Sequence, residues 1–553
     1  MYLHSQQYTL LFSVLNFCIL THTSPLPSNN GSLIATLDYG SFRGAYSPTY
    51  NLTYFRKIPF GASTAGRNRF RAPQPPLPIK NGTYNTDQAF EMCPQRTVNG
   101  SEDCLYLGLY SRPWTPQQPL RPVLLTFYGG GFVQGSATFS IPPSGFPVLN
   151  VSQTNDYVIV YSNYRTNVFG FLSGKKIKEH PETDLNAGLL DQRAALEWIQ
   201  KNIHVFGGDR GNVTIWGQSA GGGSVVAQTI AAGRRRKKNS SSEGEKTEGA
   251  GLFSKALASS PFWPRTYRYD SVENEALYEK VVARVGCKRE EEGDEIACLK
   301  GVDVQKLRDV NLPLTTSQQY TTSTFTWGPV IEDDFLSAPL SEVVRGDDIN
   351  AEVVMASYNL HEGENFVPPG FLQANGEGEF NSSVASFESW LEGFLPNFSE
   401  GDLNRVKEQY PVTGTAEEIS WNSTYERAGL VYRDLVLACP AYWISSKAEK
   451  GWLVEYTIGP AKHASDTIYW NTLNPVQETD SLTYHAYAGA MASFIQTGDP
   501  NIHKITNSSV VGVPVLKEGK QFVVRSNGVI NESISLLERR CAFWMSVAGK
   551  VPI

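Results

Sequence analysis

Val213-Thr-Ile-Trp-Gly-Gln-Ser219-Ala-Gly221 joins a run of β-branched and aromatic residues to the pattern Gly-x-Ser-x-Gly. Residues 213–216 predict a strand, and the small residues after Ser219, followed by an apolar run to Ile230, predict a helix packed closely on a sheet. A serine hydroxyl is a weak nucleophile at neutral pH, so chemistry on it requires a tight turn, a nearby base and oxyanion donors. The strand-turn-helix context makes Ser219 the candidate nucleophile.

Further apolar runs along the chain predict a largely parallel sheet, because helical stretches separate them. Between two of them, the run from Leu189 to Ile199 has apolar residues at helical spacing, as a crossover between parallel strands requires. The six predicted strands are Val123–Phe127, Tyr157–Tyr161, Val213–Trp216, Ala256–Ser259, Glu352–Ala356 and Trp452–Thr457.

The composition is that of a globular protein, with 41% hydrophobic and 19% charged residues in 553. The formal net charge of -7 argues against a nucleic-acid partner. No internal repeat is visible. The segment from Gly233 to Gly251 contains the basic run 234–238 and almost no apolar residue, which predicts a disordered surface insertion.

The N-terminus carries an apolar run from Leu10 to Leu20, followed by a short polar stretch. This run is short for a bilayer span and predicts a secretory signal peptide of about 24 residues. No later segment predicts a membrane anchor. Twelve Asn-x-Ser/Thr sequons fit a secreted, extracellular glycoprotein.

Six cysteines remain after the signal peptide, and an oxidising compartment allows them fifteen pairings. Two local pairs are suggested by spacing, and the remaining two cysteines would then join distant segments. The local pairs are Cys93 with Cys104 and Cys287 with Cys298, which leaves Cys439 with Cys541.

The base is expected among the histidines after Ser219, because α/β hydrolases carry the triad in the order Ser, acid, His. His361 comes too early in the chain unless the acid precedes it, which leaves three candidates. Of His463, His485 and His503, only His463 lies in a loop shortly after a predicted strand. The acid is expected after the strand ending near Ala356. Two carboxylates in that loop, Glu362 and Glu364, are candidates, and position alone does not separate them.

Oxyanion donors are expected from the backbone of Ala220 and from a glycine-rich loop after an earlier strand. Tyr128-Gly-Gly-Gly-Phe132 follows the strand Val123–Phe127, and its glycines allow close approach of the backbone to a substrate. Four aromatic residues are candidate pocket walls, although core packing explains each equally well: Phe132, Phe262, Trp263 and Trp327.

From about residue 33 to 546 the chain resembles the type-B carboxylesterase, or cholinesterase-like, family of α/β hydrolases. The resemblance rests on ordered motifs: Ser101-Glu-Asp-Cys-Leu-Tyr-Leu107, Tyr128 to Phe132, Asn163 to Leu172, Phe206-Gly-Gly-Asp209 through Gly222, Asn359-Leu-His-Glu-Gly363 and Gly498-Asp-Pro-Asn501. It implies an α/β-hydrolase fold, with a mostly parallel sheet flanked by helices and long loop insertions, as one domain over residues 25–553.

By this resemblance Ser219 is the nucleophile, Glu362 the acid and His463 the base. Gly130, Gly131 and Ala220 are the oxyanion donors, and the three cysteine pairings above match those of the family. Gln218 stands where the family usually has Glu, and Tyr128 where it often has His. No cofactor or metal is implied.

Only ten residues separate Cys93 from Cys104, whereas related lipases and cholinesterases carry a long loop there. This loop has no Trp to bind a quaternary ammonium group and is too short for a large amphipathic lid. We therefore expect a secreted esterase that acts on small soluble esters. The alternatives are a lipase for longer acyl chains and a non-catalytic adhesion protein of the same fold. The sequence does not predict the oligomeric state.

Overall fold

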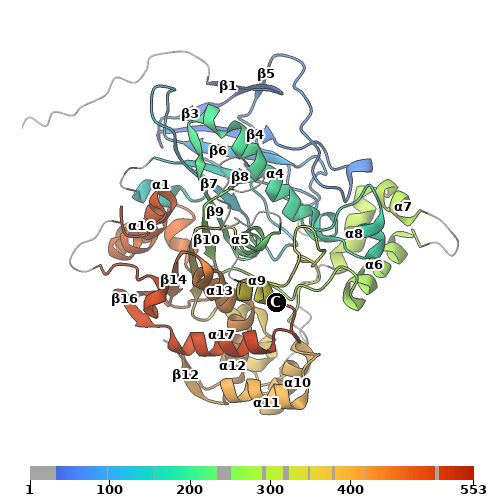
Figure 1. Cartoon of the computed structure of the whole chain (residues 1–553), viewed down its shortest axis with the longest axis vertical. Coiled ribbons are helices and arrows are strands. Elements are labelled where there is room, and N and C mark those ends of the chain that lie inside the picture. Colours follow the sequence, from blue (N-terminus) through green and yellow to red (C-terminus); the bar gives the residue numbers. More distant parts are fainter. Residues whose placement is uncertain are drawn as a thin grey trace, which may run out of the picture.

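An eleven-stranded sheet runs through the middle of the molecule (Figure 1). The structure is a computed structural model that describes residues 33–553 apart from 96–97, 153, 155, 233–250, 289–293, 315–322, 347–348, 377–379, 417–418 and 505–509. The strands, in spatial order, are β16 (Gly528–Ser533), β15 (Lys520–Arg525), β14 (Lys450–Tyr456), β11 (Val353–Asn359), β10 (Lys255–Ser259), β9 (Gly208–Gln218), β7 (Arg121–Phe127), β8 (Val158–Ser162), β6 (Tyr106–Ser111), β4 (Leu52–Pro59) and β3 (Ala45–Ser47).

The centre of this sheet is parallel, from β15 through β8. All six strands predicted from the sequence lie side by side in this region, and the expected α/β-hydrolase fold is confirmed. Parallel strands are covered on both faces, so their residues are continuously apolar and easy to recognise in a sequence. In β10, for example, all five residues are buried.

The sequence reasoning missed the parallel strand β15 and the outer, antiparallel strands. The antiparallel strands are β3, β4 and β6 at one edge and β16 at the other. In β4 the buried positions are interrupted by Arg56 and Lys57, which lie partly exposed. Antiparallel strands near the edges of a sheet carry a weaker hydrophobic signal than the central parallel ones.

Helices cover both faces of the sheet (Figure 1). On one side lie α1 (Phe146–Val151), α14 (Thr467–Trp470) and α16 (Ser481–Thr497), and on the other α4 (Ala187–Asn202), α5 (Ala220–Ile230) and α13 (Cys439–Lys447). The predicted crossover helix is α4, which connects β8 to β9.

The remaining elements decorate this framework. The helices are α2 (Asn167–Phe171), α3 (Lys175–Glu179), α6 (Val272–Val285), α7 (Glu295–Gly301), α8 (Val304–Leu314), α9 (Leu340–Val343), α10 (Val384–Phe394), α11 (Glu400–Gln409), α12 (Thr424–Arg433), α15 (Val476–Thr479) and α17 (Ser535–Val547). Two small sheets combine β1 (Ile34–Leu37), β2 (Gly40–Arg43) and β5 (Thr83–Asn85), and β12 (Gly414–Ala416) with β13 (Ile419–Trp421).

The three expected disulfides are present. Cys93 pairs with Cys104, Cys287 with Cys298, and Cys439 with Cys541. The predicted signal peptide and nearly all of the predicted disordered insertion lie outside the described residues.

The carboxyl ends of the parallel strands meet at one edge of the sheet, and the predicted site residues follow these ends. The glycine-rich loop follows β7, Ser219 follows β9, Glu362 follows β11 and His463 follows β14. Ligands of open α/β sheets bind at this edge.

Candidate active site

Ser219 occupies a strained turn between β9 and α5. Its backbone has φ 59° and ψ -125°, a conformation that non-glycine residues rarely adopt. The turn is possible because glycines surround it. A Cβ on Gly217 would lie 2.2 Å from the carbonyl carbon of Gly221, and a Cβ on Gly221 would lie 2.1 Å from the carbonyl oxygen of Phe127.

The glycine-rich loop lies directly against Ser219. A Cβ on Gly129 would be 3.1 Å from Cβ of Ser219, and Gly130 and Gly131 have φ of 111° and 63°, which favour glycine. Helix α5 begins at Ala220, where backbone N–H groups have no intrahelical acceptor. Of the predicted oxyanion residues, Ala220 directly follows the serine, and the loop that contains Gly130 and Gly131 approaches the serine through Gly129.

Tyr128 holds the start of the glycine-rich loop, at the position where the family that the sequence resembles often has His. Its ring stacks on that of Tyr164 with centroids 4.1 Å apart. The Tyr128 hydroxyl donates to the carbonyl of Tyr164, and the Tyr164 hydroxyl donates to the carbonyl of Tyr128 at 2.7 Å. This reciprocal pair fastens the start of the loop to the segment after β8.

His463 and Glu362 form a hydrogen-bonded pair. Nδ1 of His463 lies 2.9 Å from Oε2 of Glu362, and the carboxylate is fully buried. The backbone N–H of His463 donates to Oδ1 of Asn365 at 2.9 Å, so the loop after β11 holds both the ring and its backbone. Ala461 and Ala464, on either side, have φ of 48° and 69°, and this strain marks a tightly determined loop.

The second ring nitrogen of His463 faces Gln218. Its Nε2 lies 3.4 Å from Nε2 of the Gln218 amide, which can only donate. An imidazole that donates from Nδ1 to Glu362 and accepts at Nε2 is the tautomer of a general base. Among the hydrogen bonds of the described residues none joins Ser219 Oγ to His463, a contact that often forms only when substrate binds.

Glu364, the competing acid, is engaged elsewhere. Its Oε1 lies 2.7 Å from Nδ1 of His361, and its Oε2 accepts a hydrogen bond from Nζ of Lys462. Burial would raise the pKa of Glu364, but the hydrogen bonds and charges of His361 and Lys462 hold it below its usual range. This arrangement favours Glu362 as the acid.

The cluster of His361, Glu364 and Lys462 is a feature that the sequence reasoning missed. His361 precedes Glu362 and Lys462 precedes His463, so the cluster joins the acid loop to the base loop. The hydroxyl of Tyr425, from α12, donates to the carbonyl of Glu364 at 2.8 Å. The signal in the sequence was a titratable residue directly before the proposed acid and another directly before the proposed base, namely His361 and Lys462.

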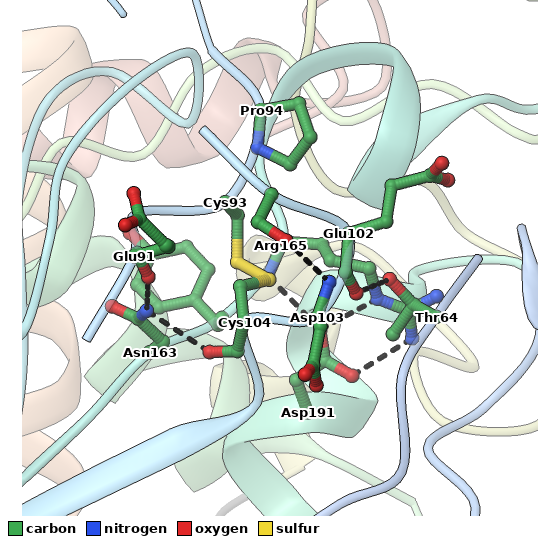
Figure 2. The surroundings of a disulfide bond; sticks show 12 residues. Thr64, Glu91, Cys93, Pro94, Glu102, Asp103, Cys104, Asn163, Arg165 and Asp191 are labelled. Carbon is green, nitrogen blue, oxygen red and sulfur yellow. Dashed lines mark hydrogen bonds and ion pairs between the residues drawn. A yellow bond between two sulfur atoms is a disulfide. The ribbon is translucent and has the colours of Figure 1, made fainter. Parts of the chain in front are cut away.

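The short disulfide loop is firmly attached to the body of the protein (Figure 2). Asn163 donates to the carbonyls of Glu91 and Cys104 at 3.1 and 3.0 Å, at either end of the Cys93–Cys104 bridge. Thr64 donates to the carbonyl of Glu102 at 2.7 Å. Close by in the same view lies the buried pair of Arg165 and Asp191.

A cavity of about 240 Å³ opens beside Gly129 and Gln218. Its aromatic walls include Tyr128, Trp216 and Trp470, and no charged side chain lines it. It offers space next to the nucleophile on the side of Gln218.

The four aromatic residues proposed as pocket walls fall into two groups. All four belong to the hydrophobic core, and two of them, Phe262 and Trp327, also line a second cavity, considered below. No group of His, Cys, Asp or Glu in the described part of the chain could hold a metal ion. No helix there has the length and apolar character of a bilayer span.

The chain as a whole is similar to several known proteins. The sequence model described as the Carboxylesterase family matches residues 31–544. A carboxylesterase, patB, of Aspergillus clavatus is 27% identical over 84% of this chain and 79% of its own length. "Secreted lipase 4" of Gibberella zeae is 26% identical over 88% and 87% of the two chains. The crystal structure of Aspergillus niger EstA superposes with a TM-score of 0.79 at 24% identity, covering 95% of this chain and all of that one.

Proposed function

Because this chain belongs to the carboxylesterase family and is a carboxylic ester hydrolase, we propose that it acts through an acyl-enzyme formed on Ser219. His463 is the general base, Glu362 orients it, and the backbone N–H groups of Gly130, Gly131 and Ala220 bind the oxyanion. The observation that carries this proposal is the strained Ser219 turn, with the glycine-rich loop against it and the His463–Glu362 pair reaching its neighbour Gln218.

In the first half-reaction, Nε2 of His463 takes the proton of the Ser219 hydroxyl as Oγ attacks the ester carbonyl. The new C–O bond places negative charge on the former carbonyl oxygen, which the amides of the glycine-rich loop and Ala220 bind. The intermediate collapses, the C–O bond to the alcohol breaks, and His463 protonates the departing alcohol.

In the second half-reaction, water takes the place of the alcohol. His463 removes its proton, the acyl carbon is attacked again, and the carboxylic acid is released as Ser219 regains its proton. Buried Glu362 stabilises the imidazolium in both halves. Protonation of His463 before the reaction removes the base, so the rate falls in acid.

The test is covalent labelling by an organophosphate, followed by mass spectrometry of the peptide that contains residue 219. Wild-type protein is expected to be labelled at Ser219 and to lose esterase activity in parallel. Ser219→Ala should be folded, unlabelled and inactive on p-nitrophenyl butyrate. Activity retained by this variant would remove Ser219 from the mechanism.

We further propose that the substrates are soluble esters of short or medium acyl chains. The support is the short loop between Cys93 and Cys104, which is held at both ends and leaves no length for a large lid. The second candidate is a lipase, favoured by the similarity to a protein named a secreted lipase. Hydrolysis rates measured on p-nitrophenyl esters of increasing acyl-chain length separate the esterase from the lipase. A marked preference for long-chain esters, at concentrations above their solubility limit, favours the lipase.

We also propose that the protein is secreted after removal of about 24 residues. The apolar run 10–20 and the three disulfides support an oxidising destination. The secretion proposal is tested by expressing the full chain in a eukaryotic secretory host. The N-terminus of the protein found in the medium is then sequenced. Intact Met1 on a cell-associated product would contradict it.

A further inference from the structure

A second cavity, of about 340 Å³, lies next to the glycine-rich loop, on the far side of Phe325 from Gly131. It is enclosed by residues after β10, by the start of α6, by residues 323–330 and by Phe394 at the end of α10. Its volume is at the small end of the range for ligand pockets.

Aromatic rings form the wall between this cavity and the proposed catalytic residues. The backbone N–H of Phe262 donates to the carbonyl of Ser219 at 2.9 Å. The ring of Phe325 lies against Gly131, where a Cβ would be 2.4 Å from it. Phe366 contacts both Phe325, with centroids 6.1 Å apart, and His463, at 5.0 Å. The cavity is therefore one layer of side chains away from the active site.

Arg265 is the notable polar group of the cavity. Its Nη1 donates to the carbonyl of Phe394 at 3.0 Å, which caps the end of α10 but uses only one of five N–H groups. In the described part of the chain, Nε is buried without a hydrogen-bond partner, and no carboxylate lies within ion-pair distance of the guanidinium. Burial lowers the pKa of Arg265. Glu273, on the same cavity, attracts this cation from beyond ion-pair distance, and the guanidinium lies 5.9 Å from the ring centroids of Tyr267 and Phe394. A ligand carboxylate would therefore be its first directly bonded counter-ion, which favours binding because a buried charge is costly unless it is paired and hydrogen-bonded.

Trp327 provides a second donor. Its indole is 1% exposed and lines the cavity, and among the described residues Nε1 has no hydrogen-bond partner. The other charged lining groups are Lys280 and Glu273, one of each sign. Both unsatisfied groups are donors, so the fitting ligand presents acceptors and negative charge on an apolar body.

We propose that this cavity binds an apolar carboxylate, with its oxygens on Arg265 and its hydrocarbon part against Phe262, Phe325 and Trp327. Arginine suits this role because its planar fork binds carboxylate at two points. Only the source of the carboxylate depends on the proposed ester hydrolysis. That source is either the free carboxylate at the far end of the acyl chain of a dicarboxylic half-ester, or the carboxylic acid that hydrolysis releases.

The binding test uses calorimetry on the full secreted protein with octanoate and with octanamide, which has the same chain but no charge. Wild type is expected to bind octanoate at least about tenfold more tightly, as a charged hydrogen-bonded pair implies. Arg265→Met should lose this preference and Arg265→Lys should keep part of it. Arg268→Met is the matched control, because Arg268 is exposed, pairs with Asp333 and does not line the cavity.

Equal binding of the two probes by wild type, or an unchanged preference in a folded Arg265→Met protein, would overturn the proposal. Because no turnover is involved, these outcomes are independent of Ser219 chemistry. Hydrolysis of monoethyl suberate and ethyl octanoate then distinguishes the sources. If wild type hydrolyses the half-ester faster and Arg265→Met abolishes this preference, the ligand is the acyl chain of the half-ester. If wild type binds octanoate but does not prefer the half-ester, the ligand is the released acid.

Discussion

At the scale of single residues, Gln218 is placed to set the pH range of the reaction. Its amide faces Nε2 of His463 at 3.4 Å, where a carboxylate would attract a proton to the ring. We expect Gln218→Glu to stabilise the protonated imidazole and to move the acid limb of kcat/KM upward by roughly one pH unit. Gln218→Met, which removes the amide without adding charge, should leave the limb in place. Measured pH–rate profiles that coincide for all three proteins would exclude this role.

Glu364 is expected to stabilise the fold in a pH-dependent way. Its pKa in the folded protein lies below the ordinary value of 4.5, so its contribution is complete above that pH and is lost as pH falls through the folded pKa. Glu364→Gln should lower the free energy of unfolding by about 2 kcal/mol at pH 7, and the difference from wild type should shrink below pH 4.5.

Urea unfolding at several pH values measures this difference. Glu388→Gln is a suitable control, because Glu388 forms a half-exposed pair with Lys407 and should change stability little. A constant difference between wild type and Glu364→Gln across the whole pH range would contradict the assignment.

At the scale of elements, the pair of Arg165 and Asp191 joins α4 to the segment after β8. Two guanidinium nitrogens and the backbone N–H of Arg165 donate to the Asp191 carboxylate at 2.8 to 2.9 Å, and both side chains are buried. Arg165→Ala would leave this charge unpaired and should cost about 3 to 5 kcal/mol in denaturant unfolding. Arg193→Ala, which removes an exposed pair on the same helix, should cost about 0.5 kcal/mol or less. Similar losses for the two variants would refute the argument.

At the scale of the whole molecule, the disulfides differ in how much chain they restrain. Cys439–Cys541 spans 102 residues, from the start of α13 to α17, whereas Cys287–Cys298 spans 11. In the chain-entropy account, replacing the long-range pair by alanines should cost about 4.7 kcal/mol and the local pair about 3 kcal/mol. Equilibrium unfolding of the two double variants gives the comparison, and a larger loss for the local pair would contradict this account.

The local signals in the sequence were sufficient for the central architecture. These signals are properties of short segments, so they were recognisable without coordinates. They are a strand that enters Gly-x-Ser-x-Gly, apolar strands separated by a helix, and three glycines after a strand. The outer strand β4 was not recognisable from the sequence, because Arg56 and Lys57 interrupt its apolar pattern.

The sequence by itself determined where the nucleophile turn and the glycine-rich loop lie, because glycine and β-branched residues act on their own backbone. Position in the chain did not separate Glu362 from Glu364, and the family resemblance was the reason for choosing Glu362. The tertiary structure shows that Glu362 is the carboxylate that faces His463, whereas Glu364 faces His361. The contact of Gln218 with His463 and the cavity of Arg265 and Trp327 were invisible in the sequence. Each depends on packing between segments far apart in the chain, and no local pattern encodes that packing.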